Sequence, residues 1–187
     1  MVVVGFEEVP PGSGLRHEHL RFLTPMAEGA SDQVRAARLD DLEACLQIVR
    51  ALPDFFTEDV PTTVRCDFER HDGWVIVDAG KIVGFVVVDR RSPRVAEILW
   101  IAVEPARRGT GCGTRLLEHA LGVLRDQGIA LVEVKTLDRS AGYAPYEATN
   151  AFYERNGFVQ IDCIDEPPER EPGNPAAIYV AALGTTR

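Results

Sequence analysis

The sequence contains no run that approaches the roughly 20 consecutive apolar residues of a membrane-spanning helix. Its start, MVVVGFEE, lacks the basic beginning and the longer apolar stretch of a secretory signal peptide. Basic residues are not in surplus either, because 20 Lys and Arg stand against 29 Asp and Glu, a net charge of −9. We therefore expect neither a membrane nor a nucleic acid as a partner. The excess of acidic residues weakly favours partners that carry an amine.

Cysteine is scarce, and its spacing predicts no metal site. The four cysteines are Cys45, Cys66, Cys112 and Cys163. They form no C-x-x-C pair and no cluster with histidine at metal-ligand spacing. A chain of 187 residues can bury a sizeable core without disulfides. We expect free thiols, a cytoplasmic protein and no bound metal.

Two common phosphate-binding motifs are also absent. A P-loop needs G-x-x-x-x-G-K-[S/T], whereas Lys81 follows Gly80 but precedes isoleucine. A dinucleotide fingerprint, G-x-G-x-x-G, starts at Gly109 and Gly111 but meets Thr114 at its last position. The sequence therefore predicts neither kind of nucleotide site.

Hydrophobic periodicity begins only after the first 32 residues, which we expect to form a flexible N-terminal arm ahead of a single domain, residues 33–187. Strands are predicted at 33–38, 73–78, 81–90, 94–103, 129–137, 158–164 and 176–183. Helices are predicted after Asp40, within 53–73, behind the glycines of 109–113, and at 147–157. Asp40 is expected to cap the first of them, with Glu43 at the capping-box position. This order, β-α-α-β-β-β-α-β-α-β-β, indicates an α/β (α+β) domain.

The stretch "VEPARRGTGCGTRLLEHALGVL", residues 103–124, places three glycines within five residues directly ahead of a predicted helix. A strand that enters a helix through glycines exposes backbone N–H groups at the positive end of the helix dipole. Such a turn can bind a phosphate group, with Arg107 or Arg108 adding charge and Thr114 a hydroxyl. The alternative is a tight turn in which the glycines only serve unusual backbone angles.

The stretch Arg108-Gly109-Thr110-Gly111-Cys112-Gly113 resembles the [Q/R]-x-x-G-x-[G/A] motif of the GCN5-related N-acetyltransferase (GNAT) family. A second segment, FYERNGF at 152–158, is similar to that family's FYexxGF segment. The resemblance covers about residues 34–182. It implies a mixed sheet of about six to seven strands, splayed in the middle, with helices on both faces.

The resemblance also implies acetyl-coenzyme A as the donor and no metal. The pyrophosphate would lie on the turn formed by Arg108, Gly109, Thr110, Gly111, Cys112, Gly113 and Thr114. The pantetheine arm would pair with the strand backbone at Ile101, Ala102 and Val103, as an added strand. The thioester would then lie between the strands ILWIAV and LVEVKTL.

Two catalytic residues follow from the same resemblance. Tyr153 matches the family tyrosine that faces the sulfur, and would protonate the departing thiolate. Its alternative role is that of a core aromatic. Glu97 in AEILWIAV matches the glutamate base of the family's histone acetyltransferases, and burial in an apolar strand suits that role. Alternatively Glu97 faces outward or pairs with an arginine such as Arg94, and a water accepts the proton.

The sequence departs from the family at Tyr146, where an asparagine is frequent, so no cofactor role is assigned to Asn150. The acceptor side is expected from PDFFTEDV, residues 53–60, and from the loop 143–146. Together these features predict an acetyl-coenzyme A-dependent N-acetyltransferase acting on a primary amine of a small molecule or peptide. The alternatives are a non-catalytic acyl-coenzyme A sensing module and, less favoured, an interaction protein that uses only the fold. The resemblance also allows a homodimer.

Overall fold

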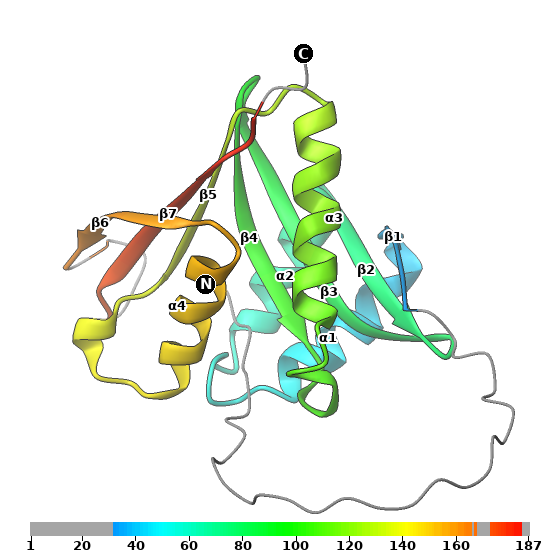
Figure 1. The fold of residues 1–187 in the computed structure, drawn as a ribbon. Helices are drawn as coiled ribbons and strands as arrows, with labels where there is room; N and C mark the ends of the chain where they lie inside the picture. Colours follow the sequence, from blue (N-terminus) through cyan, green and yellow to red (C-terminus); the bar gives the residue numbers. More distant parts are fainter. Residues whose placement is uncertain (1–31, 166, 168–172, 185–187) are drawn as a thin grey trace, which may run out of the picture.

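A mixed seven-stranded sheet, in the order β1-β2-β3-β4-β5-β7-β6, runs through the computed structural model, which describes residues 32–165, 167 and 173–184 (Figure 1). Its strands are β1 (Gln33–Ala36), β2 (Asp72–Asp78), β3 (Lys81–Ser92), β4 (Val95–Val103), β5 (Leu131–Leu137), β6 (Val159–Ile164) and β7 (Ala176–Ala182). The helices are α1 (Leu42–Arg50), α2 (Val60–Arg70), α3 (Cys112–Asp126) and α4 (Pro145–Arg155). The predicted N-terminal arm lies outside the described residues, apart from Asp32.

The predicted element order and fold class are confirmed, and one local detail is wrong. Asp40 does not cap α1, because a 3-10 turn at Leu39–Asp41 precedes the helix. Asp41 is the N-cap residue of α1 but makes no side-chain hydrogen bond to that helix; its carboxylate instead accepts a hydrogen bond from the Arg38 backbone N–H at 2.8 Å, at the start of the 3-10 turn. Arg35 holds the same carboxylate at 2.6 and 2.8 Å and is the main reason that its pKa is lowered.

Helices cover both faces of the sheet, as expected. In Figure 1, α3 and α4 lie in front of the sheet and α1 and α2 behind it. The front layer buries the apolar stripe of α3, namely Leu116, Leu117, Ala120 and Leu124. Full burial of each leucine contributes about 1.5–3 kcal/mol. None of the helices in the described parts of the chain is long and apolar enough to cross a membrane.

A β-bulge in β4 decides which of its side chains face which layer. Val87 of β3 lies opposite Trp100 and Val88 lies opposite Ile98, so Leu99 is an extra residue on β4. Because of it, Ile98 and Ile101 both face the α3 layer, whereas Trp100 packs in the layer under α1 and α2. The bulge lies where β4 begins to leave β5, since the parallel pairing of the two strands ends at Ile98.

A buried thiol in the α1–α2 layer should make the free energy of unfolding decrease at alkaline pH. Cys45 is fully buried, and this burial raises its pKa to about 12. The unfolded thiol loses its proton near pH 9, so above that pH the unfolded state binds fewer protons than the folded one. The contribution of Cys45 is thus complete below pH 9 and decreases by about 1.4 kcal/mol per pH unit above it.

We expect urea unfolding between pH 8 and 11 to show this decline, and Cys45→Ala to make it shallower. Cys66→Ala is the matched control, because Cys66 is exposed on α2. An equal slope in wild type and Cys45→Ala would contradict the assignment.

Candidate active site

A gap opens in the middle of the sheet where β4 leaves β5. The two strands pair in parallel only from Val95 to Ile98, beside Leu131 to Val134. Past this point β4 continues to pair with β3 alone among the described strands. Figure 1 shows the separation as a V that widens toward the start of α3.

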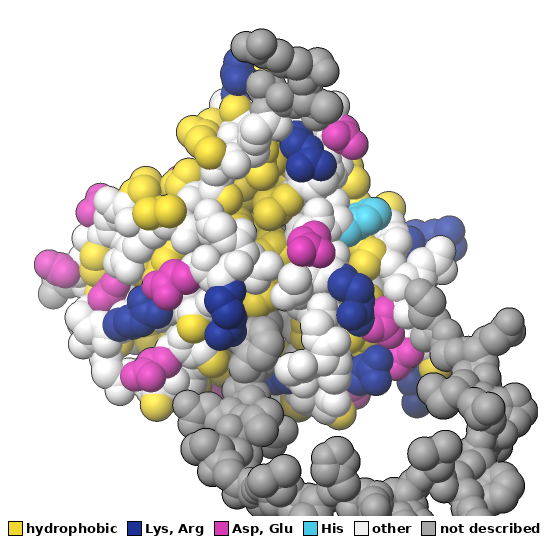
Figure 2. All heavy atoms as spheres, in the orientation of Figure 1, with side chains coloured by type: hydrophobic (Ala, Val, Ile, Leu, Met, Phe, Trp, Pro, Cys, Tyr) yellow, Lys and Arg dark blue, Asp and Glu magenta, His cyan; other side chains and the backbone are white. Residues whose placement is uncertain are grey.

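The backbone of β4 presents hydrogen-bonding groups to this gap. Glu104 N–H donates to Val83 O of the neighbouring strand segment at 2.8 Å. Backbone groups alternate in direction along a strand, so those of Ile101 and Val103 point the other way, into the gap. The groups of Ala102, which lies between them, point toward β3. In Figure 2, hydrophobic side chains line the surface between α3 and the strands β5 and β7.

A glycine turn lies below the gap, where the sequence predicts it. Gly109 and Gly111 have φ angles of +72° and +83°, which only glycine adopts readily. Gly111 is the N-cap of α3, and no side chain among the described residues caps the first N–H groups of that helix. A Cβ on Gly111 would lie 3.2 Å from Nη1 of Arg115. Gly113 is buried in the first turn of α3, beside the half-buried Thr114.

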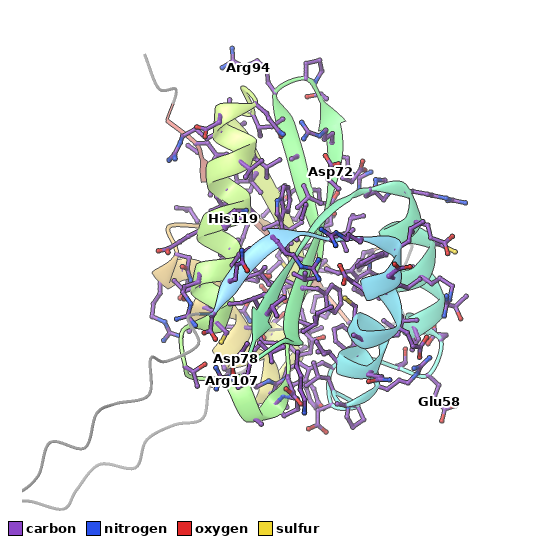
Figure 3. The ribbon with its side chains drawn as sticks, turned by 90° about the vertical axis from the view of Figure 1, so that its right-hand side faces the viewer. Glu58, Asp72, Asp78, Arg94, Arg107 and His119 are labelled. Carbon is purple, nitrogen blue, oxygen red and sulfur yellow. The ribbon has the colours of Figure 1, made fainter. Side chains whose placement is uncertain are left out.

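The two arginines ahead of the turn differ in what they contact. Arg107 pairs with Asp78 at 2.7 Å and with Asp32 at 3.2 Å (Figure 3). Arg108 extends over the ring of Phe55, with its guanidinium carbon 4.8 Å from the ring centroid. Its Nε and one Nη atom are buried without a hydrogen-bond partner among the described residues. Burial lowers the pKa of Arg108, because removing the charged guanidinium group from water costs free energy.

Tyr153 lies on the opposite side of the gap, on α4. Its side chain is fully buried and contacts the rings of Phe152, Phe158 and Tyr179 at centroid distances of 5.4 to 6.0 Å. Its hydroxyl is buried and has no hydrogen-bond partner among the described residues. Burial raises the pKa of this phenol well above its usual value. A buried hydroxyl without a partner is uncommon and is a site at which a ligand atom can bind.

Asn150 fixes α4 against the end of β5. Its Nδ2 donates to Leu137 O at 3.2 Å and to Tyr146 O at 2.9 Å. Its Oδ1 is buried without a partner among the described residues. The side chain therefore sets the position of the helix that carries Tyr153, one turn away. The sequence left Asn150 without a role, and its buried carbonyl was not foreseeable from the motif.

Asn150→Ala should lower the free energy of unfolding by about 1–3 kcal/mol, because two backbone carbonyls lose their buried donor. Asn156→Ala is a matched control at the end of the same helix, where Nδ2 makes one part-buried bond to Phe152 O at 2.8 Å. We expect a smaller loss there. Urea unfolding at neutral pH measures both, and equal losses would contradict the role given to Asn150.

Glu97 is not an isolated carboxylate in an apolar strand. It is buried, yet its Oε2 accepts hydrogen bonds from Arg91 of β3 and its Oε1 accepts one from Lys135 of β5 at 3.2 Å. The arginine is Arg91 and not Arg94, because Arg91 lies on the same face of the sheet. Neither cation was foreseen from the sequence, since each reaches Glu97 from another strand.

The two segments expected on the acceptor side do come together. Tyr143 Oη donates to Asp54 O at 3.0 Å, and Tyr146 Oη donates to Phe55 O at 3.2 Å. The loop between α1 and α2 is thereby tied to the start of α4. Glu58 of that loop points to the solvent (Figure 3), so its charge does not face the gap.

Two other features lie away from the gap. A surface pocket of about 240 Å³ lies between Arg38, Phe68 and His71. His119 lies on α3 with its ring 6.4 Å from that of Trp74 (Figure 3). Among the described residues no group of three or more His, Cys, Asp or Glu side chains could hold a metal ion.

Comparison with known proteins identifies residues 69–160 as an acetyltransferase (GNAT) domain. No curated protein sequence gives a significant match. Among solved structures, the ribosomal-protein-S18-alanine N-acetyltransferase of Escherichia coli shares 22% identity and a TM-score of 0.68, over 83% of this chain and 96% of that one. Ard1 from Thermoplasma volcanium shares 22% identity and a TM-score of 0.66, over 82% of this chain and 98% of that one. An aminoglycoside 6'-N-acetyltransferase complexed with coenzyme A shares 16% identity and a TM-score of 0.67, over 83% of this chain and 99% of that one. At these identities the likeness is one of fold.

Proposed function

This chain belongs to the GNAT family of acetyltransferases through residues 69–160, and we propose that it transfers an acetyl group from acetyl-coenzyme A directly to a primary amine. The observation that carries the proposal is the position of two unusual features on either side of one gap. The glycine turn lies below it, and α4 lies across it, carrying the Tyr153 hydroxyl that is buried without a partner among the described residues (Figure 1).

The described residues fit the donor. Coenzyme A carries a pyrophosphate, which suits the turn from Arg108 to Thr114 and the N–H groups behind Gly111, which no described side chain caps. Its pantetheine arm carries amides, which suit the backbone groups that Ile101 and Val103 of β4 present to the gap, whereas those of Ala102 point toward β3. The buried donors of Arg108 have no acceptor among the described residues, as expected of groups that meet a phosphate.

Tyr153 would supply the proton for the leaving group. Acetyl-coenzyme A, when bound, supplies the thioester, and transfer of its acetyl group releases a thiolate. A phenol is protonated at neutral pH, and burial raises the pKa of Tyr153 further, so Oη carries the proton that it would donate. The same burial keeps water away from that atom.

Glu97 would accept the proton of the amine through a water molecule. An alkyl amine has a pKa near 10, so it must lose a proton before it can attack. Both oxygens of Glu97 are held by cations, Oε2 by Arg91 and Oε1 by Lys135. Since Oε1 accepts only one of these bonds, it retains a lone pair for a water hydrogen.

The acceptor is a primary amine of a small molecule or peptide. The fold neighbours named above include one whose name specifies a protein alanine and one whose name specifies an aminoglycoside. The fold thus serves both classes of acceptor in other proteins. Four free cysteines are compatible with a cytoplasmic enzyme.

Calorimetric titration with acetyl-coenzyme A tests the proposal, with desulfo-coenzyme A as a second ligand that cannot react. We expect saturable binding of both, followed by thiol release when an amine acceptor is added. Donor binding without thiol release across a broad amine panel would favour the sensing module. A folded protein that binds neither ligand would contradict the proposed function altogether.

A further inference from the structure

Asp32 places its carboxylate between the two arginines that flank the glycine turn. Its Oδ1 lies 3.2 Å from Nη2 of Arg107, and its Oδ2 accepts a hydrogen bond from Nη2 of Arg115. The same Oδ2 lies 3.5 Å from Sγ of Cys112, the first residue of α3. Only 12% of the Asp32 side chain is exposed, so this carboxylate is held in the site and does not lie loosely on the surface.

Arg115 lies directly against the turn. Its Nη1 is 3.5 Å from Thr110 O and 3.2 Å from the point that a Cβ on Gly111 would occupy. Its Nη2 lies 3.4 Å from Sγ of Cys112. An anion bound by Arg115 is therefore next to the backbone that the proposed function assigns to the donor's pyrophosphate.

The arginine pair has donors that the carboxylates leave unused. Arg107 pairs with Asp78 and Asp32 through one nitrogen, Nη2, whereas its Nε is buried without a partner among the described residues. A carboxylate has two oxygens and one charge. A phosphate offers three oxygens and more charge, so it is the better partner for two guanidinium groups.

We propose that Arg107 and Arg115 form a subsite for a phosphate group of the donor, and that Asp32 occupies this subsite in its absence as an internal competitor. The proposal rests on the proposed function, because it takes the donor to be a coenzyme A thioester. Asp32 precedes β1, and its contacts with the turn are made by its side chain, so it can leave the arginines without unpairing the sheet. The apparent donor affinity is lowered by the fraction of molecules in which Asp32 holds the arginines.

Asp32→Asn tests the competition, with coenzyme A as the probe in calorimetric titrations. Loss of the charge should raise the affinity about two- to fivefold, the range set by a partly exposed ion pair. Asp72→Asn is the matched control: it removes the same charge from an exposed carboxylate paired with Arg90, far along the sheet from the turn. We expect no change there, because screening removes long-range effects at physiological salt.

Dephospho-coenzyme A distinguishes the two phosphate sources. A gain for coenzyme A alone assigns the subsite to the 3′-phosphate, whereas equal gains for both ligands assign it to the pyrophosphate. Arg115→Met should act in the opposite direction and weaken the same ligands, and it remains informative if Asp32→Asn folds poorly. Arg125→Met, in the last turn of α3, controls for the loss of a positive charge from that helix.

The failures are separable. If wild type binds coenzyme A and a folded Asp32→Asn binds it no better, or Arg115→Met binds it equally well, then Asp32 merely anchors the start of β1 and the inference is wrong. If neither wild type nor Asp32→Asn binds coenzyme A, the proposed function fails and the inference fails with it.

Discussion

Gly111→Asp should abolish binding of acetyl-coenzyme A while the protein remains folded. The substitution puts a carboxylate at the N-cap of α3, where the proposed pyrophosphate lies on the backbone. Two like charges about 4 Å apart repel by about 4 kcal/mol at an effective dielectric constant near 20. The φ angle of +83° adds strain, and a Cβ approaches Arg115 Nη1 to 3.2 Å. We therefore expect the affinity to fall at least about 100-fold in calorimetric titration.

Gly122→Asp is the control for this variant. It adds the same charge to the same helix at a position without a positive φ angle, where the nearest atom to a new Cβ is Nη2 of Arg125 at 3.9 Å. Its donor affinity should stay close to that of wild type. A folded Gly111→Asp protein with unchanged affinity would mean that the glycines only shape a turn.

Tyr153→Phe should reduce kcat about 100-fold or more and leave donor affinity almost unchanged, since general acids contribute about 10²- to 10⁴-fold. Removal of a buried tyrosine hydroxyl usually lowers the free energy of unfolding, but here we expect no such loss. The hydroxyl is buried without a partner among the described residues, so its removal breaks no described hydrogen bond. The free energy of unfolding should stay the same or rise by up to about 1–3 kcal/mol.

Tyr179→Phe provides the matched comparison. Tyr179 is also fully buried, but its hydroxyl accepts a hydrogen bond from Arg139 at 3.4 Å and donates one to Glu154 at 3.2 Å. That variant should lose about 1 kcal/mol of stability and keep its kcat. Full activity in Tyr153→Phe, measured by thiol release, would remove this tyrosine from the mechanism.

Features that depend on neighbours in sequence were predictable. The spacing of apolar residues in α3 specifies a buried face, and two glycines with positive φ angles occur where the motif places them. The two residues left between the predicted strands 73–78 and 81–90, Ala79 and Gly80, do form a hairpin turn, and both have positive φ angles. The cap of α1 was misplaced by one residue, because periodicity does not reveal a 3-10 turn.

Features that depend on register between distant strands were not predictable. Glu97 receives Arg91 from β3 and Lys135 from β5 because of an antiparallel irregularity after Asp89 and a parallel register at Glu133. Neither register is encoded near position 97. The contact of Asp32 with Arg115 spans 83 positions, and no local pattern announces it. Likewise, only the packing of α4 reveals that Tyr153 has no described hydrogen-bond partner.

The early end of the β4–β5 ladder at Ile98 gives the proposed donor a second role. An arm that pairs with β4 beyond this point would complete the sheet, so the ligand would act as a structural element of the fold. Any molecule that binds the native state alone stabilises it, by about 2.7 kcal/mol at 100 times its Kd. The Tm would then rise with the concentration of acyl donor, and resistance to proteolysis in the cell would follow the acyl-coenzyme A supply.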